Sequence, residues 1–413
     1  MVIAFKTKED MVMIDFSKYY TAAEIVALTS NLVSIPSHCD VKDREADVGD
    51  FIYDWAVSNG FEAKKVPVEG RRNNIYISVP GSGNGSDLLL NGHIDTVPPF
   101  NMIVDPFNPV VIDNNLYGRG TNDMKGGVAC MLMALLVLKR AGIKLEGNVL
   151  MTAVCGEEEE SDGTEIFALE DDHHFDGAVV GEPSGYMYSL GNRGLEWIEI
   201  KFTGKTVHGG QAHLGINAIS KASKFIERVA RDLEPVINSR TDEYMGPAIM
   251  NYGKIFGGDM PSTVAGECTL QLDRRYIPGE TPKSVIQEYQ DIIDELSKED
   301  PDFKAEISLM PNGQMKTLHH TPAAADPEAK INRCIEDLLC EFLNVEEAPK
   351  NRCRGWTDAG ILSTYMNIPT AIFGPGKIEN SHTVDEHISV EMLYDFVSLY
   401  ANLAVRFCGI SNQ

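Results

Sequence analysis

The chain has 413 residues, of which 43% are hydrophobic and 23% are charged, a balance typical of folded globular proteins. This length exceeds what one hydrophobic core usually supports, so we expect two domains. The formal net charge of -25 repels phosphate groups and argues against a nucleic acid partner.

The sequence shows no sign of a membrane or export segment. Residues 1–6 lack the basic start and apolar stretch of a secretory signal. The longest apolar run, residues 128–138, is too short to span a membrane and is typical of a buried helix. The eight cysteines contain no C-x-x-C pair, as expected of reduced thiols inside a cell. We therefore expect a cytoplasmic protein with no membrane partner.

The first part of the chain has the pattern of an α/β domain. Thr21 and Glu24 form a capping box, which predicts an amphipathic helix that ends near Pro36. Between residues 75 and 180, short β-type runs alternate with helical stretches, which predicts a largely parallel sheet covered on both faces. Ligands bind such sheets at the carboxyl ends of the strands.

The pattern changes near Gly194. Residues 195–202 and 268–272 have the composition of strands, and residues 216–233 carry apolar side chains at helical spacing. We expect residues 194–310 to form a smaller α+β domain that is inserted into the first domain. The first domain would then consist of residues 1–193 and 311–413.

Several short apolar or glycine-rich segments are followed directly by side chains that can bind metal. These side chains are His93 and Asp95, Asp123, Glu157 and Glu158, Glu182, and His382. Imidazoles combined with carboxylates suit zinc, manganese or cobalt rather than thiolate chemistry. Together the residues form a sufficient ligand set for two metal ions.

Each of these motifs also has a purely structural explanation. His93 and Asp95 are two residues apart, so both can face the same way in an extended chain, but the pair alone is more typical of a strand end with a turn cap. Asp123 is compatible with a helix N-cap, and Glu157 to Glu160 with a solvated acidic loop. Their joint occurrence after buried strands favours the metal site, where adjacent acids can divide metal binding and proton transfer.

These motifs, in this order, resemble those of the dinuclear zinc amidohydrolases and exopeptidases that include acetylornithine deacetylase, succinyl-diaminopimelate desuccinylase, aminoacylase and related carboxypeptidases. The resemblance extends from residues 34–37 to His382. It implies a zinc-exopeptidase-like α/β/α catalytic domain with a mostly parallel central sheet. It also implies that the inserted α+β domain is ferredoxin-like, serves as a lid and joins two subunits into a homodimer.

The resemblance implies a role for each candidate ligand. Asp123 would bridge two divalent ions, which we expect to be zinc, with cobalt or manganese as alternatives, and the Asp123-Met124 peptide would be cis. The other ligands would be His93 and Glu182 for one ion, and Glu158 and His382 for the other.

The acidic run departs from the family pattern. The resemblance implies that Asp95 orients a ligand and that Glu157 is the general base and acid. However, Gly156 stands where relatives usually carry Asp, and two further acids extend the run. An assignment of base and ligand one position later therefore stays open.

The resemblance also implies residues that contact the substrate. His208, within a Gly-Lys-Thr-Val-His-Gly-Gly run, would stabilise the oxyanion. Arg275 would clamp a substrate carboxylate, a task that suits a planar guanidinium, although the neighbouring Arg274 is an alternative. Gly374 and Gly376 would add backbone N–H groups to the same carboxylate.

The expected activity is hydrolysis of the amide bond in a small carboxylate-bearing substrate, first of all an N-acyl amino acid. A di- or tripeptide exopeptidase of the same family is the alternative. A non-catalytic homologue is a further one, because Ser262 stands where many relatives have Asn. A dinucleotide-binding loop at residues 81–85 is discounted, because the run precedes its strand and lacks the third glycine.

Overall fold

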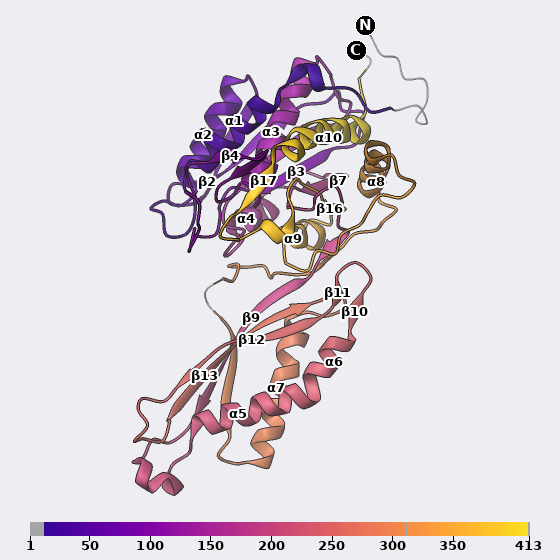
Figure 1. Cartoon of the computed structure of the whole chain (residues 1–413). Coiled ribbons are helices and arrows are strands. Elements are labelled where there is room, and N and C mark those ends of the chain that lie inside the picture. The colour runs from indigo at the N-terminus through magenta and orange to yellow at the C-terminus, as the bar shows by residue number, and fades with distance from the viewer. Residues whose placement is uncertain (1–11, 311–312, 412–413) are drawn as a thin grey trace. The chain divides into compact units, whose positions relative to one another are not determined.

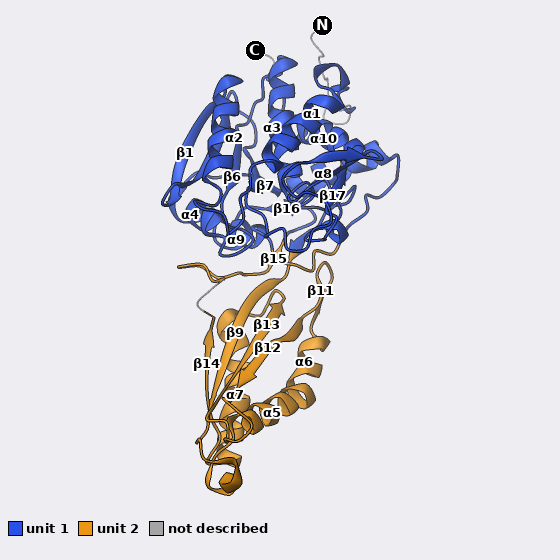
Figure 2. Ribbon diagram, turned by 60° about the vertical axis from the view of Figure 1, so that its left-hand side comes forward, with its two compact units in different colours: residues 1–191, 325–351, 357–413 blue, residues 192–324, 352–356 orange. Residues whose placement is uncertain are grey.

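The computed structural model describes residues 12–310 and 313–411 (Figure 1). The chain divides into two compact units (Figure 2). Unit 1 comprises residues 1–191, 325–351 and 357–413, and unit 2 comprises residues 192–324 and 352–356. Residues 1–6, for which we expected no export signal, lie outside the described residues.

Unit 2 is larger than the inserted segment that we expected, residues 194–310. It also contains residues 311–324 and the short segment 352–356. The backbone N–H of Arg193 donates to the carbonyl of Gly355 (3.1 Å), and the indole N–H of Trp356 donates to the carbonyl of Thr321 (3.1 Å). These bonds join segments that are distant in the chain, so the local sequence pattern cannot indicate them.

Unit 1 contains a six-stranded sheet in the order β1-β2-β6-β3-β7-β16. The strands are β1 (Glu62–Glu69), β2 (Arg72–Val79), β3 (Leu88–His93), β6 (Val149–Val154), β7 (Gly177–Val180) and β16 (Thr370–Ile372). β6, β3, β7 and β16 pair in parallel, whereas β2 is antiparallel to both of its neighbours. The expected largely parallel sheet is confirmed.

The helices of unit 1 cover both faces of this sheet. α1 (Ala22–Val33), α3 (Lys125–Arg140) and α10 (Val390–Cys408) pack against one another on one side, and α2 (Ala46–Ser58) packs against β2 (Figure 1). On the other side, α4 (Asp162–Glu170) packs against α9 (Ala359–Thr364). α8 (Lys330–Leu343) packs against α10 and contacts β7 and β16. The unit is therefore an α/β/α sandwich.

Local sequence features explain two helices of this unit. The predicted capping box begins α1, because Thr21 Oγ1 accepts from the N–H of Glu24 (3.2 Å) and Glu24 accepts from the N–H of Thr21 (3.0 Å). α3 is buried from Lys125 to Leu138, which explains its continuous apolar run. Among the described residues, no helix combines the length and apolarity that crossing a membrane requires.

A small antiparallel sheet brings two distant loops together. It has the order β17-β5-β4 and consists of β4 (Val110–Ile112), β5 (Asn115–Tyr117) and β17 (His387–Ser389). Because His387 pairs with Tyr117, the loop before β17 lies beside the glycine-rich turn that follows β5. The remaining short elements of this unit are the 3-10 turns Ser17–Tyr19 and Ile378–Asn380.

Unit 2 has the βαββαβ order of a ferredoxin-like fold. Its strands β9 (Gly194–Thr203), β12 (Ile249–Gly257), β13 (Glu267–Tyr276) and β14 (Lys304–Leu309) form an antiparallel sheet in the order β12-β13-β9-β14. α5 (Ala218–Arg228) and α7 (Pro282–Glu299) supply Phe225 and Tyr289 to a core that also contains Phe202 and Leu270. The expected ferredoxin-like insertion is confirmed.

The helix that we expected over residues 216–233 begins at residue 218, because the Asn217 side chain accepts from the N–H of Ser220 (3.1 Å). It continues through a π-turn, Val229–Leu233, into α6 (Glu234–Ser239). The remaining short elements are the 3-10 turn Gly209–Leu214, the strands β10 (Thr241–Asp242) and β11 (Gly246–Pro247), and the two-residue strands β8 (Gly191–Asn192) and β15 (Ala323–Ala324).

Candidate metal centre

Three parallel strands deliver potential ligands to one edge of the large sheet. His93 is the last residue of β3 and lies level with Val154, the last residue of β6. Glu157 and Glu158 follow β6 directly, and Glu182 follows β7 by two residues. Because these strands run in parallel, their carboxyl ends meet at the same edge, as we expected.

Two groups of these side chains have the composition and spacing of metal sites. His93, Asp123 and Glu182 form one group and Asp123, Glu158 and His382 the other, with the donor atoms of each group within 4.8 Å of one another. All five predicted ligands are therefore brought together. Every donor is an imidazole nitrogen or a carboxylate oxygen, a set that fits zinc, cobalt or manganese.

Asp123 belongs to both groups, and its two oxygens face different imidazoles. Oδ1 lies 3.3 Å from Nε2 of His93, and Oδ2 lies 3.4 Å from Nε2 of His382. The same two imidazoles also approach Glu182 (3.4 Å) and Glu158 (2.9 Å), respectively. The carboxylate is thus placed as a bridge, and its peptide bond to Met124 is cis, as the resemblance implies.

Asp95 holds two parts of the site at once. Its Oδ1 lies 3.4 Å from Nδ1 of His93, the ring nitrogen that does not face Asp123. Its Oδ1 and Oδ2 also accept from the backbone N–H groups of Glu157 (3.2 Å) and Glu158 (3.0 Å). Asp95 therefore both orients the imidazole and fixes the acidic turn after β6.

The conformation of the acidic turn after β6 indicates which of its acids face the two groups of candidate ligands. Glu159 points elsewhere, because its Oε2 lies 2.7 Å from Nη2 of Arg44. Gly156 has a φ of +78°, and a Cβ there would lie 2.1 Å from Oδ1 of Asp162. Glycine is therefore required at 156, and the geometry favours Glu157 and Glu158 over an assignment one position later.

The buried carboxylates of the site repel one another. Burial and the nearby Asp123 raise the pKa of Glu182 to about 8, and burial and Glu182 raise the pKa of Glu157 well above its ordinary value. Burial by itself lowers the pKa of His382, but Asp123 and Glu158 raise it to about 11. This concentration of negative charge is what divalent cations would neutralise, so the residues fit two metal ions.

Glu386 holds the loop that carries Asp123 through hydrogen bonds to its backbone. This role was not predicted from the sequence. Glu386 is fully buried, and its Oε1 accepts from the N–H groups of Gly120 (2.9 Å), Asn122 (3.0 Å) and Asp123 (3.1 Å). Its other oxygen pairs with Arg119. Glu386 thereby connects the chain that carries His382, four residues earlier, to the loop that carries Asp123. An acid shortly after the last ligand was the available sequence signal.

The predicted substrate residues are not all in unit 1. His208 and Arg275 belong to unit 2 and stay predictions. His208 is exposed, and its Nδ1 accepts from the N–H of Gly210 (3.1 Å). Arg275 forms a two-pronged pair with Asp273 (2.8 and 2.9 Å), whereas Arg274 is fully buried and pairs with Glu280. Arg274 is therefore structural, which leaves Arg275 as the candidate clamp.

The two predicted backbone donors in unit 1 already have acceptors. The N–H of Gly374 donates to Oγ of Ser184 (3.0 Å), and the N–H of Gly376 donates to Sδ of Met392 (2.9 Å). A substrate carboxylate would have to displace these partners. The predicted role of Gly374 and Gly376, donating N–H groups to a substrate carboxylate, stays a prediction, and these existing hydrogen bonds do not favour it.

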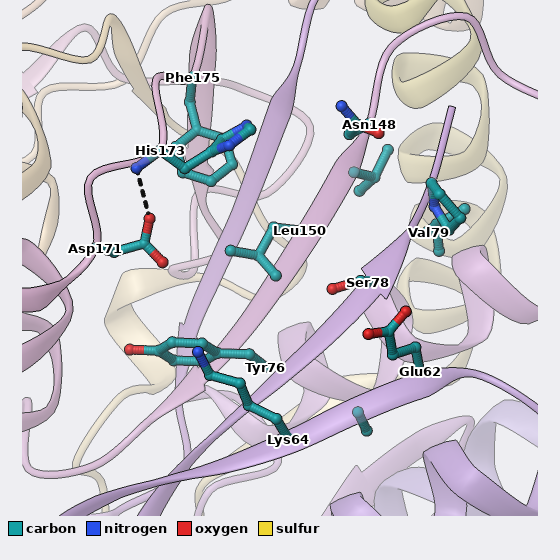
Figure 3. A pocket seen from close by; sticks show the side chains of 13 residues that line it. Glu62, Lys64, Tyr76, Ser78, Val79, Asn148, Leu150, Asp171, His173 and Phe175 are labelled. Atoms are coloured by element: carbon teal, nitrogen blue, oxygen red, sulfur yellow. Dashed lines mark hydrogen bonds between the residues drawn. The ribbon is translucent and has the colours of Figure 1, made fainter. Parts of the chain in front are cut away.

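A separate cavity lies at the opposite end of the sheet. Its volume is about 370 Å³, and Tyr76, Leu150, Phe175 and Glu62 are among its lining residues (Figure 3). Leu150 is the second residue of β6, so the cavity is near the amino end of that strand rather than its carboxyl end. No predicted ligand lines it, and it is not the metal centre.

Comparison with known proteins agrees with this geometry. Residues 89–406 match the model of peptidase family M20/M25/M40. A probable succinyl-diaminopimelate desuccinylase of Staphylococcus aureus (strain N315) is 25% identical over 94% of this chain and 98% of that protein. A deformylase of Bacillus subtilis (strain 168), named for N-formyl-4-amino-5-aminomethyl-2-methylpyrimidine, is 28% identical over 94% and 95%.

The fold is also that of a solved tripeptidase from Staphylococcus aureus, with a TM-score of 0.75 and 23% identity over 93% of this chain and 97% of that one. The family resemblance inferred from the motifs is confirmed by these matches.

We predict that Glu386 sets metal affinity. A Glu386→Gln variant keeps the side-chain shape but loses the charge that faces Arg119 and three N–H groups, so we expect divalent ions to bind about 10- to 100-fold more weakly. Competition with a chelator measures this. Glu379→Gln, an exposed acid on the same loop, is the control. Equal affinity in both variants would show that Glu386 does not position the site.

We also predict that metal binding releases protons. At pH 7 the metal-free chain holds protons on Glu182 and His382, since their pKa values are raised to about 8 and about 11. Ligands must lose these protons, so affinity should rise as the pH increases through about 8, with roughly one or more protons released per chain. Zinc titration calorimetry in two buffers of different ionisation enthalpy measures the release. Identical heats in both buffers would contradict the prediction.

Proposed function

Because the chain belongs to peptidase family M20/M25/M40, we propose that it hydrolyses the amide bond of an N-acyl amino acid at a centre of two divalent metal ions. Membership makes the chain a hydrolase of amide or peptide bonds. The proposal depends above all on one observation, the two imidazole and carboxylate groups that share Asp123.

We assign the metal ligands as His93 and Glu182 on one side of Asp123, and Glu158 and His382 on the other. The proposed ions are zinc, with cobalt and manganese as alternatives, since the nitrogen and oxygen donors suit all three. Two bound ions would lower the pKa of a water molecule and polarise the carbonyl of the substrate amide.

Glu157 is the proposed proton carrier. Its side chain is 9% exposed, and its Oε2 lies 4.0 Å from Nε2 of His93, beside the first ligand group. Its backbone is fixed by Asp95, so the carboxylate has a defined position. A largely buried carboxylate whose pKa is raised above its ordinary value can accept a proton from water and later donate it to the leaving amine. The amine needs this proton because an amide anion is a poor leaving group.

The remaining proposed roles belong to unit 2. His208 would donate a hydrogen bond to the oxyanion. Arg275 would bind the substrate carboxylate through its planar fork, and its pairing with Asp273 supports this by holding the guanidinium in one orientation. Both roles are carried over from the family resemblance.

The preference for an N-acyl substrate is supported by the names of two relatives, a desuccinylase and a deformylase, and the preference for an amino acid by the name of the first, succinyl-diaminopimelate desuccinylase. A di- or tripeptide exopeptidase is the second candidate, favoured by the peptidases for which the family is named. A non-catalytic homologue is the least favoured, because the ligand set and Glu157 are intact.

A substrate panel tests the proposal. The panel contains N-acetyl, N-succinyl and N-formyl amino acids and dipeptides, each assayed with zinc, cobalt and manganese, with the products identified by mass spectrometry. We expect cleavage of at least one N-acyl amino acid. Cleavage of dipeptides alone would favour the exopeptidase, and cleavage of nothing would contradict the proposed function.

In the same assay, we expect Glu157→Gln to lower the rate by about a hundred- to ten-thousandfold, the usual contribution of a general acid and base, with metal content unchanged. Glu159→Gln is the matched control, because this neighbouring acid pairs with Arg44 and should leave the rate near that of the wild type. The reverse result, with activity lost only in Glu159→Gln, would move the assignment of the base along the acidic turn.

We further propose a homodimer formed through unit 2. β12 is an edge strand that is paired on one side only, and Ile249, Ile255 and Phe256 on it are 38%, 50% and 49% exposed. Such an edge favours pairing with a second chain. Sedimentation equilibrium should show a dimer that Ile255→Lys weakens. A wild-type monomer at all concentrations would contradict this.

A cytoplasmic location is also proposed, from the cysteine pattern of the sequence. Cell fractionation that finds the protein outside the cytoplasm would contradict it.

A further inference from the structure

Arg72, the first residue of β2, is held between two acids. It is 4% exposed, and Glu45 and Asp162 are 0% and 2% exposed. Nε and Nη2 of Arg72 donate to Glu45 (2.6 and 3.2 Å), while Nη1 and Nη2 donate to Asp162 (2.6 and 3.0 Å). Because a carboxylate binds the planar guanidinium on each side, the side chain has one orientation. The network joins the start of β2 to Glu45, directly before α2, and to Asp162, the first residue of α4.

The acidic turn, residues 156–161, is followed directly by Asp162. The backbone of the turn is closed by the N–H of Ser161, which donates to the carbonyl of Gly156 (2.6 Å). Ser161 has a φ of +51°, and within the described residues its side chain makes no capping hydrogen bond to α4. The start of α4 therefore has no local cap that fixes it. The ion pair between Asp162 and the buried Arg72 holds it instead.

A second side chain of β2 holds both ends of the acidic turn. Asn74 is fully buried and lies two residues after Arg72, so the two side chains point to the same face of the sheet. Its Oδ1 accepts from the N–H of Cys155 (3.1 Å), and its Nδ2 donates to the carbonyl of Gly163 (2.8 Å). Cys155 precedes the turn and Gly163 follows Asp162, so Asn74 sets the distance between the two ends of the turn.

The network of Arg72 lies directly beneath the first residue of the turn. A Cβ at Gly156 would lie 2.1 Å from Oδ1 of Asp162 and 3.0 Å from Nη2 of Arg72. Burial and the negative charge of the nearby Asp95 raise the pKa of Glu45. Asp95 in turn accepts hydrogen bonds from two backbone N–H groups of the turn. The acidic turn is therefore held by Asp95 and by the side chains of β2 together.

We propose that Arg72 and Asn74 are positioning residues of the metal centre, because they hold the acidic turn in the conformation that presents its first two acids. In this conformation Glu158 faces His382 (2.9 Å), and Glu157 lies beside the first ligand group. The roles of these two acids as metal ligand and proton carrier rest on the proposed function. The support of the turn by β2 does not depend on that function.

Selective weakening of one metal ion would distinguish positioning from general stability. Of the five proposed ligands, Glu158 alone lies on the turn, and it belongs to the group with Asp123 and His382. Arg72→Lys keeps the charge but loses the fork that bonds two carboxylates. We expect one of two zinc ions to bind about tenfold or more weakly, and the other as in the wild type. Competition with a chelator, followed for each ion, measures this. Unchanged affinity for both ions, or equal weakening of both, would overturn the proposal.

A buried ion pair in unit 2 supplies the matched control. Glu280→Gln breaks the pair with the buried Arg274 and should leave both zinc affinities unchanged. Asp162→Asn is the milder variant of the network, because it keeps the shape of the side chain and removes one charge. It should weaken the same ion as Arg72→Lys. An Asp162→Asn chain that unfolds at the wild-type temperature and binds both ions normally would also overturn the proposal.

Hydrogen exchange of the metal-free chain tests the support without metal or substrate. The backbone N–H groups of residues 157–161 should lose protection in Arg72→Lys, whereas those of α3 should exchange as in the wild type. Glu280→Gln should leave both segments unchanged. If the wild type cleaves no amide and this selective loss still occurs, the proposed function fails while the support of the turn stands. Unchanged exchange in the turn of Arg72→Lys would overturn that support.

Discussion

Repulsion among buried carboxylates is the constraint on which the rest of unit 1 depends. Asp123, Glu158 and Glu182 lie close to two imidazoles; Asp123 and Glu182 are buried, and Glu158 is half-buried. Without a cation, such a group must hold extra protons, as the raised pKa of Glu182 indicates. The parallel sheet makes this costly arrangement possible, because its rigid strands force the ligands to one edge.

Two further acids act from behind the ligands. Asp95 accepts hydrogen bonds from the backbone N–H groups of the acidic turn after β6. Glu386 accepts hydrogen bonds from the backbone N–H groups of the loop that carries Asp123. Backbone N–H groups gathered around a carboxylate restrict how the loop can move, so each acid converts a flexible turn into a fixed support. The ligands of the site are thus positioned by hydrogen bonds to the backbone as much as by their own side chains.

The buried arginine side chains of the two units differ in whether they have a carboxylate partner. In unit 1, the buried Arg72 and Arg119 are neutralised by carboxylates of the chain itself. In unit 2, Arg274 is neutralised in the same way, but Arg193 has only a backbone carbonyl. Within the described residues, the buried Arg72 and Arg119 of unit 1 thus have carboxylate partners, whereas the buried Arg193 of unit 2 has none.

The sequence by itself predicted the main elements and the set of candidate ligands. Apolar runs that end in His93, Glu158 or Glu182 predicted both strands and ligands, because burial and strand ends leave a local pattern. Only the tertiary structure decided between neighbours of the same type. Glu159 forms an ion pair with Arg44 instead of facing the site, and the buried Arg274 forms an ion pair with Glu280. Glu386 accepts a hydrogen bond from the N–H of Asp123, which lies 263 residues earlier in the chain. These choices depend on partners far away in the sequence, and local periodicity carries no information about such partners.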